Sequence, residues 1–261
     1  MLRTSVMLFS RTENANPRIG ECSMVDLETD VELAIITIDR PEARNAISLN
    51  TMDALDKALD GTVGASALVI TGGGDRAFVS GGDLKELATL RTELEASAMA
   101  WRMRSICDRI AGFPGPVIAA LNGHALGGGA EVAVAADIRI AADDIKIGFN
   151  QISLAIMPAW GGAERLARLV GRSRALLLAG TGRVLDAVEA ERIGLIDQVV
   201  PRAEFAAAWR STAHQLARRP AGEIKRVLDG VPTTEAVAAF ARLWVSDEHW
   251  AAADKVMNKG K

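Results

Sequence analysis

The sequence predicts an α/β layered fold, in which helices cover a mostly parallel sheet. Two short, dense apolar runs, at 67–72 and 116–123, are typical of strands that are covered on both faces. A helical pattern lies between them, and this alternation of strands and helices favours parallel strands joined by right-handed crossovers. The 261 residues, 49% of them apolar, suffice for one large domain with a sizeable core.

The N-terminal part of the sequence contains the first predicted strand. Residues 1–23 show little periodicity and no secretory signal, and we expect residues 1–27 to be a disordered extension. Residues 31–40, VELAIITIDR, alternate as a half-buried strand does, and Pro41 ends this strand.

Two helices are predicted before residue 116. Residues 49–59 have helical spacing, with Ser48 or Asn50 as the capping residue. Residues 93–110 place apolar side chains on one helical face. These side chains are Met99, Met103, Ile106 and Ile110.

The C-terminal third is predicted to be helical. From Gly161 onward the patterns favour helices, with no second sheet in this part of the chain. We therefore divide the chain into an α/β core over residues 28–200 and a C-terminal helical region over residues 201–261.

Composition argues against several classes of partner. The net charge of −3 gives no electrostatic reason to expect nucleic acid or an acidic membrane surface. No apolar run reaches the ~18 residues that a membrane span needs. Cys22 and Cys107 form neither a disulfide framework nor a metal-ligand spacing, and Cys107 is predicted to be a buried thiol. We expect a reducing, cytoplasmic location and no metal.

Two glycine-rich turns are the candidate site. AFVSGGDLKEL (77–87) and LGGGAEVAVAAD (126–137) each read as a strand, then glycines, then a helix. At such helix starts, backbone N–H groups point outward at the positive end of the helix dipole. If the N–H groups of Gly82 and Gly128 converged, they would form an oxyanion hole for a carbonyl oxygen that gains negative charge. Glu131 lies on the first turn of the second helix, where the dipole favours an acid.

Four stretches of the chain resemble the crotonase (enoyl-CoA hydratase/isomerase) superfamily. These stretches are IDRPEARNAIS (38–48), AFVSGGDLKEL (77–87), PVIAALNGHALGGGAEVAVAADIRIA (116–141) and PAWGGAERLARLVG (158–171). The resemblance implies a ClpP/crotonase-like fold of repeated ββα units with a C-terminal helical trimerisation region. It also implies a homotrimer or a hexamer made of two trimers.

The same resemblance implies the substrate and the residues that bind it. The substrate would be an acyl-CoA thioester whose carbonyl is held by the N–H groups of Gly82 and Gly128. No separate cofactor is expected, because CoA is part of the substrate. The other residues assigned to the CoA and acyl groups are Glu42, Arg44, Ala46, Ser80, Gly81, Asp83, Leu84, Gly127 and Trp160.

One position departs from the pattern of the hydratases that the chain resembles. Those enzymes use two glutamates around one water; Glu131 matches the first, but Gln151 occupies the second position. Gln cannot act as a general base. A single acid resembles the ethylmalonyl- and methylmalonyl-CoA decarboxylase branch, in which loss of CO₂ generates the enolate directly. On this interpretation, Asn150 and Gln151 hydrogen-bond the departing carboxylate.

Decarboxylation of a short 2-alkylmalonyl-CoA is therefore the first hypothesis from the sequence. The alternatives are an enoyl-CoA hydratase or isomerase of fatty-acid-type metabolism, and a non-catalytic acyl-CoA-binding homologue. Trp160 has two interpretations: it narrows the acyl pocket, or it packs in the core.

Overall fold

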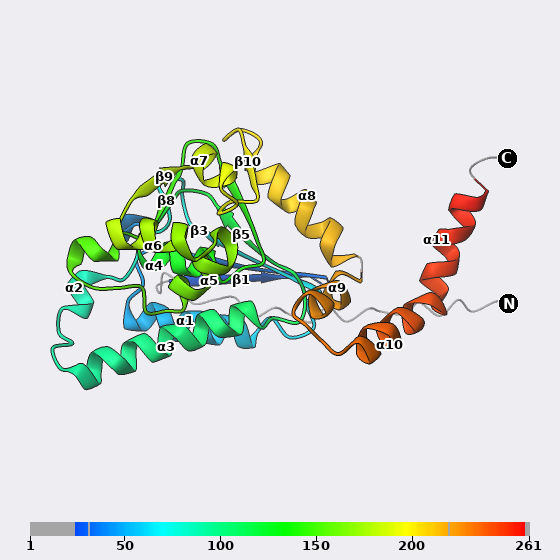
Figure 1. Cartoon of the computed structure of the whole chain (residues 1–261), viewed down its shortest axis with the longest axis horizontal. Helices are drawn as coiled ribbons and strands as arrows, with labels where there is room; N and C mark the ends of the chain where they lie inside the picture. Colours follow the sequence, from blue (N-terminus) through cyan, green and yellow to red (C-terminus); the bar gives the residue numbers. More distant parts are fainter. Residues whose placement is uncertain (1–23, 31, 219, 259–261) are drawn as a thin grey trace, which may run out of the picture.

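A computed structural model describes residues 24–30, 32–218 and 220–258, and in it two sheets are surrounded by helices (Figure 1). The larger sheet has six strands, in the spatial order β1 (Val25–Thr29), β2 (Leu33–Ile38), β3 (Ala67–Gly72), β5 (Val117–Leu121), β7 (Ile138–Ala142) and β10 (Gln198–Val200). The smaller sheet has four, in the order β4 (Ala77–Val79), β6 (His124–Leu126), β8 (Lys146–Gly148) and β9 (Val184–Asp186).

The larger sheet is parallel from β2 to β10, as predicted, while β1 runs antiparallel to β2. The expected disorder of residues 1–27 is wrong for 25–27, because these residues begin β1 and pair with β2. Residues 1–23, including Cys22, lie outside the described residues. Strand β1 is held in place by its pairing with β2, and this pairing cannot be recognised from the sequence pattern of residues 25–29.

Strand β2 is shorter and more enclosed than predicted. It spans Leu33–Ile38, and five of its six residues are buried, so it is covered on both faces rather than half-buried. The apolar runs of β3 and β5 are buried throughout, as predicted. Each fully buried Ile, Leu or Val side chain contributes about 1.5–3 kcal/mol to folding, so these central strands hold much of the stability.

The helices before residue 200 follow the predicted order. They are α1 (Leu49–Asp60), α2 (Leu84–Leu87), α3 (Glu93–Ala111), α4 (Gly128–Ala133), α5 (Gly162–Val170), α6 (Arg172–Thr181) and α7 (Ala187–Arg192), with 3-10 helices η1 (Pro41–Ala43) and η2 (Asn150–Leu154). Ser48 caps α1 by accepting a hydrogen bond from the Thr51 N–H. On α3, Met103, Ile106 and Ile110 are buried and Met99 is partly buried, which confirms the predicted face.

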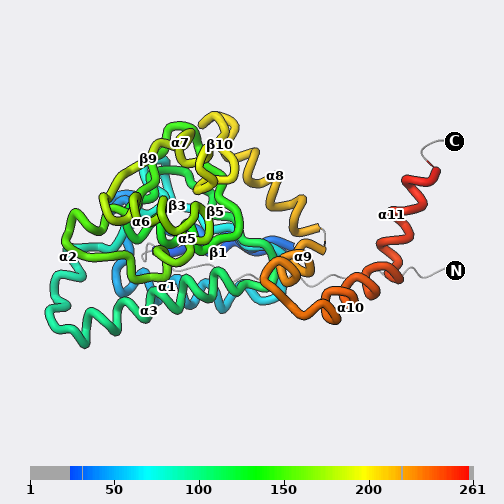
Figure 2. Tube along the Cα trace, viewed as in Figure 1, coloured from blue at the N-terminus to red at the C-terminus, as the bar shows by residue number. Residues whose placement is uncertain are grey.

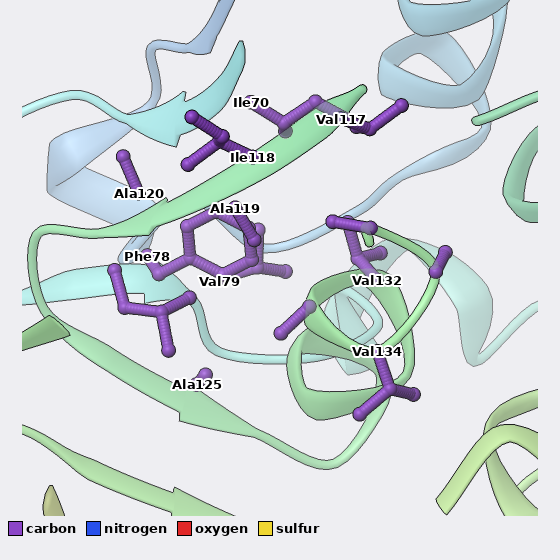
Figure 3. Packing of buried hydrophobic residues seen from close by; sticks show 14 of the residues in the cluster. Ile70, Phe78, Val79, Val117, Ile118, Ala119, Ala120, Ala125, Val132 and Val134 are labelled. Atoms are coloured by element: carbon purple, nitrogen blue, oxygen red, sulfur yellow. The ribbon is translucent and has the colours of Figure 1, made fainter. Parts of the chain in front are cut away.

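Helix α4 is buried along its whole length and packs against β4, β6 and α5. Figure 3 shows Phe78 and Val79 of β4 next to Ile118 of β5, with Val132 of α4 packed nearby. All six residues of α4 are buried, including Glu131. A rigid, dry environment of this kind fixes the first turn of α4, on which the candidate site depends.

The C-terminal region divides into a helix on the sheet and a protruding arm. It comprises α8 (Phe205–Ala217), α9 (Ala221–Leu228), α10 (Thr233–Trp244) and α11 (Asp247–Met257). Helix α8 packs on the larger sheet through Phe205, Trp209 and Ala213. Helices α10 and α11, which we call the arm, extend away from the sheets (Figures 1 and 2).

Two strands after Gly161 were missed by the sequence analysis. β9 and β10 have three residues each, and both join sheets whose other strands come earlier in the chain. Strands this short carry too little periodicity to be distinguished from loops. Among the described residues, no helix is both long enough and apolar enough to cross a membrane.

Candidate active site

The two glycine turns lie side by side. A Cβ atom placed on Gly81 would be 3.6 Å from the Gly128 nitrogen, and one on Gly129 would be 1.8 Å from the Val79 carbonyl oxygen. The end of β4 and the start of α4 are therefore in direct contact. Within the described part of the chain, the N–H groups of Gly82 and Gly128 have no hydrogen-bond acceptor. Two free donors on adjoining turns are what an oxyanion hole requires.

The segment at residues 44–47 is hydrogen-bonded along the first turn. The Ile47 N–H donates to the Gly81 carbonyl, the Asp83 N–H donates to the Ile47 carbonyl, and both distances are 2.8 Å. The Ser80 N–H donates to the Arg44 carbonyl at 3.2 Å. Arg44 has a left-handed backbone with φ of 53°. The structure thus brings the first two resembling stretches together.

The predicted CoA-binding residues differ in exposure. Glu42, Arg44 and Leu84 are exposed, so they are available to a ligand, whereas Ala46 is buried. Asp83 caps α2, and its carboxylate accepts a 3.1 Å hydrogen bond from Arg40. Arg40 was not singled out from the sequence, although it lies in the first resembling stretch. Its guanidinium also donates to the Ala46 carbonyl at 2.7 Å and joins the two segments.

Glu131 is enclosed by a turn that lies far away in the sequence. Its Oε2 accepts hydrogen bonds from the N–H groups of Trp160 (2.8 Å) and Gly162 (2.9 Å), and its side chain is only 2% exposed. Burial raises the pKa of the Glu131 carboxyl, and these hydrogen bonds oppose that rise because they favour the charged form. A carboxyl whose pKa is raised towards neutrality is suited to general base and acid work.

Gln151 lies beside Glu131, at the position that the resemblance assigned to the second glutamate, and the two side chains contact each other directly in one orientation. Its Nε2 donates to Glu131 Oε1 at 2.9 Å, because a carboxylate can only accept. Gln151 is 7% exposed, and its Oε1 is buried without a hydrogen-bond partner among the described residues. An unpaired buried acceptor costs about 1–3 kcal/mol. Gln151 Oε1 is therefore free to accept a hydrogen bond from a bound molecule.

The role expected for Gln151 in holding a substrate carboxylate stays a prediction. One N–H of Nε2 is donated to Glu131, which leaves the second N–H and the Oε1 acceptor of Gln151; Oε1 would repel a substrate carboxylate placed next to it, whereas the second N–H could donate to one. Asn150 lies nearby, with its Oδ1 3.4 Å from the position of a Cβ on Gly127. Gly127 has φ of 56°, which glycine adopts readily and other residues rarely.

Trp160 packs on the second glycine turn. Its ring atom Cζ3 lies 2.1 Å from the position that a Cβ on Gly128 would occupy, and the side chain is 6% exposed. The ring belongs to the core and at the same time borders the candidate oxyanion hole. Of the two interpretations of Trp160, core packing is thus confirmed, and an effect on the acyl pocket stays a prediction.

Other titratable side chains offer no separate centre. Cys107 is buried, as predicted, and burial raises the pKa of its thiol to about 12, so it stays protonated. His124 accepts a hydrogen bond from the Lys146 N–H at 3.1 Å. The described residues contain no group of three or more His, Cys, Asp or Glu side chains that could hold a metal ion.

Comparison with known proteins agrees with this site. The family model of enoyl-CoA hydratase/isomerase matches residues 28–240. A probable enoyl-CoA hydratase of Mycobacterium bovis is 38% identical over 208 residues, which cover 78% of this chain and 79% of the relative. A short-chain-enoyl-CoA hydratase of Clostridium acetobutylicum is 37% identical over 202 residues, covering 76% of each chain.

The fold is also shared with solved structures. The crystal structure of an enoyl-CoA hydratase from Bacillus anthracis has a TM-score of 0.78 and 30% identity, covering 87% of this chain and 91% of that one. The predicted crotonase fold is thereby confirmed, whereas the relatives named here are hydratases and lend no support to the decarboxylase branch. The chain belongs to the enoyl-CoA hydratase/isomerase family, whose enzymes act on acyl-CoA thioesters.

Proposed function

We propose that this protein hydrates a short 2-enoyl-CoA thioester to the 3-hydroxyacyl-CoA. The observation behind the proposal is the unpaired Oε1 of Gln151 beside Glu131. A water molecule has two O–H donors, so it can donate one to Gln151 Oε1 and the other to the remaining lone pair on Glu131 Oε1. A carboxylate leaving group has no donor to offer.

The reaction then needs one carboxylate and the oxyanion hole. The thioester oxygen accepts from the N–H groups of Gly82 and Gly128, which polarises the conjugated double bond. Water oxygen attacks C3 as its proton moves to Glu131, and the electron pair of the double bond becomes an enolate in the hole. Glu131 then returns the proton to C2. Each donor of such a hole contributes about 3 kcal/mol to transition-state stabilisation.

The residues expected to bind CoA keep that role in the proposal, with one refinement. Glu42, Arg44 and Leu84 offer exposed side chains at the turns. Ala46, Ser80, Gly81 and Gly127 act through their backbone and small size. Because the Asp83 carboxylate is engaged by Arg40, we assign Asp83 to shaping the turn.

We also propose that the protein assembles as trimers, or pairs of trimers, through the arm. Val237, Phe240 and Trp244 form an apolar stripe at helical spacing on α10, and their side chains are 47–61% exposed. A stripe of this kind in water favours burial against another chain. Phe240 and Trp244 also line a hollow of about 240 Å³ that could receive a side chain.

The test is an assay of two activities on three proteins. The native protein, Gln151→Met and Ser153→Ala are each incubated with crotonyl-CoA and with ethylmalonyl-CoA at one pH, and the products are identified by mass. We expect the native protein to hydrate crotonyl-CoA and leave ethylmalonyl-CoA unchanged. Gln151→Met keeps the side-chain volume but removes both the Oε1 acceptor and the Nε2 donor to Glu131, so kcat should fall about 10- to 100-fold.

Ser153→Ala is the matched control, because Ser153 lies on the same 3-10 helix and is exposed. Its kcat should stay within about twofold of native. Turnover of ethylmalonyl-CoA without hydration would replace this proposal by decarboxylation, for which the missing second glutamate is the supporting observation. Binding of both thioesters without any product would indicate a non-catalytic homologue.

A further inference from the structure

The turn at residues 160–162 supplies both backbone donors to Glu131 and is held from its other side by Arg165. Arg165 Nη1 donates to the Trp160 carbonyl oxygen at 3.2 Å. A Cβ on Gly161 would lie 2.3 Å from the same Nη1, so the guanidinium rests directly against the Gly161 backbone. Gly161 has φ of 90°, a conformation that favours glycine and permits this close approach.

Arg165 is in turn anchored on a different helix. Its Nη2 donates to Asp108 Oδ1 of α3 at 2.5 Å, and the Arg165 side chain is only 13% exposed. The planar guanidinium fork thereby links the turn to α3 through two directed hydrogen bonds. Helix α3 packs on the core through its buried face, which fixes the backbone that carries Asp108, while the Asp108 side chain itself is 55% exposed.

We propose that Arg165 is a positioning residue for Glu131: by holding the Trp160 carbonyl it fixes the orientation of the N–H groups that bind the carboxylate. The inference rests on the proposed function for its kinetic consequence, because Glu131 is the base there. If the turn loosens, the two N–H donors align less well, and the charged form of Glu131 is less favoured.

A second ion pair between the same helices provides a control. Arg104 Nη1 donates to Glu164 Oε1 at 2.9 Å, again joining α3 to α5, but within the described residues Arg104 makes no hydrogen bond to the turn. Removing Arg104 therefore takes away one positive charge near Glu131 and leaves the Trp160 carbonyl held. The titratable groups that interact directly with Glu131 are Arg104 and Cys107 on α3; Asp108 and Arg165 act on Cys107, and Glu164 pairs with Arg104.

The kinetic experiment compares Arg165→Met, Arg165→Lys and Arg104→Met in crotonyl-CoA hydration across pH. For Arg165→Met we expect kcat to fall about 10- to 100-fold with KM within about threefold, and the acid limb to move to higher pH. Arg165→Lys should recover part of the loss, because an ammonium can still donate to the carbonyl. Arg104→Met should change kcat less than about threefold. Equal effects of Arg165→Met and Arg104→Met would reduce the role of Arg165 to its charge and overturn the proposal.

A measurement without substrate separates this inference from the proposed function. Glu131 is titrated by NMR of protein labelled with ¹³C at the glutamate carboxyl carbons, with its signal assigned from Glu131→Gln. A higher Glu131 pKa in Arg165→Met than in Arg104→Met supports positioning even if the native protein hydrates nothing, and equal pKa values contradict it. If Arg165→Met does not fold, Asp108→Leu serves instead, because it removes the Oδ1 acceptor that anchors Arg165 and leaves Arg165 in place; a Glu131 pKa that does not rise in that variant also contradicts the proposal.

Discussion

Helix α8 and the arm have similar apolar patterns but opposite surroundings. Both carry apolar side chains at helical spacing, yet Phe205 and Trp209 of α8 are buried on the larger sheet, while Phe240 and Trp244 of the arm are exposed. An amphipathic pattern therefore predicts that a helix has an apolar face. It does not predict what covers that face. In this chain one face is covered by the chain's own sheet, and the other is exposed.

The largest expected effect concerns the candidate active site, whose central residue Glu131 is buried by the chain itself. Glu131→Gln should lower kcat for hydration about 10³-fold, because the only carboxylate that can exchange a proton with water is removed. Since the native pKa of Glu131 is raised, activity should be lost on the acid side at a pH above the usual range of a carboxyl, where Glu131 becomes protonated. A pH–rate profile measures both. The oligomer mass in sedimentation should not change, and a smaller mass would show that the site and the arm are not independent.

A substitution on the arm should affect assembly, in contrast to Glu131→Gln, which should affect kcat. Phe240→Asp places an unpaired charge in the apolar stripe, so assembly should weaken about 100-fold or more. Ala238→Asp is the control, because it adds the same charge to α10 outside the stripe. Sedimentation velocity over a dilution series compares the two variants. If Phe240→Asp assembles as the native protein does, the stripe is not an interface.

The smallest effect is the coupling between Gly128 and Trp160, which tests how tightly these two residues pack against each other. Gly128→Ala brings a methyl group into the Trp160 ring and should cost about 1–3 kcal/mol of stability. Trp160→Ala opens a cavity and should cost about 3–5 kcal/mol. The double variant should cost less than the sum by about 1–2 kcal/mol, because the methyl group then occupies part of the cavity. Urea unfolding at one protein concentration gives all three values; simple additivity would mean that the two residues do not press on each other.

The sequence predicted the local features well and the long-range ones poorly. Ser48 as a helix cap and the buried face of α3 follow from spacing alone, and the structure confirms both. The enclosure of Glu131 by the N–H groups of Trp160 and Gly162 could not be predicted, because it depends on a turn about 30 residues away folding back over α4.

The orientation of Gln151 shows the same limit within the candidate site. Its pairing with Glu131 followed from the resemblance, but the sequence does not say which end of the amide faces the carboxylate. That choice is made by hydrogen bonding in the folded site, where Gln151 Nε2 faces Glu131 and Oε1 is left to accept from another molecule. Predicting which residues meet was therefore easier than predicting what they do.

The three consecutive glycines have a consequence for the evolution of this chain. Gly127 needs its left-handed backbone, Gly128 yields its space to Trp160, and Gly129 lies against the Val79 carbonyl. Each requirement concerns folding, so a descendant that lost the reaction would still be selected to keep all three. In a library of variants scored only for folded protein, these positions should tolerate almost no substitution, while position 151 should accept several. Conservation of the three glycines in a related protein would thus indicate that the protein folds in the same way. The identity of residue 151 is more informative about whether that protein is still catalytically active.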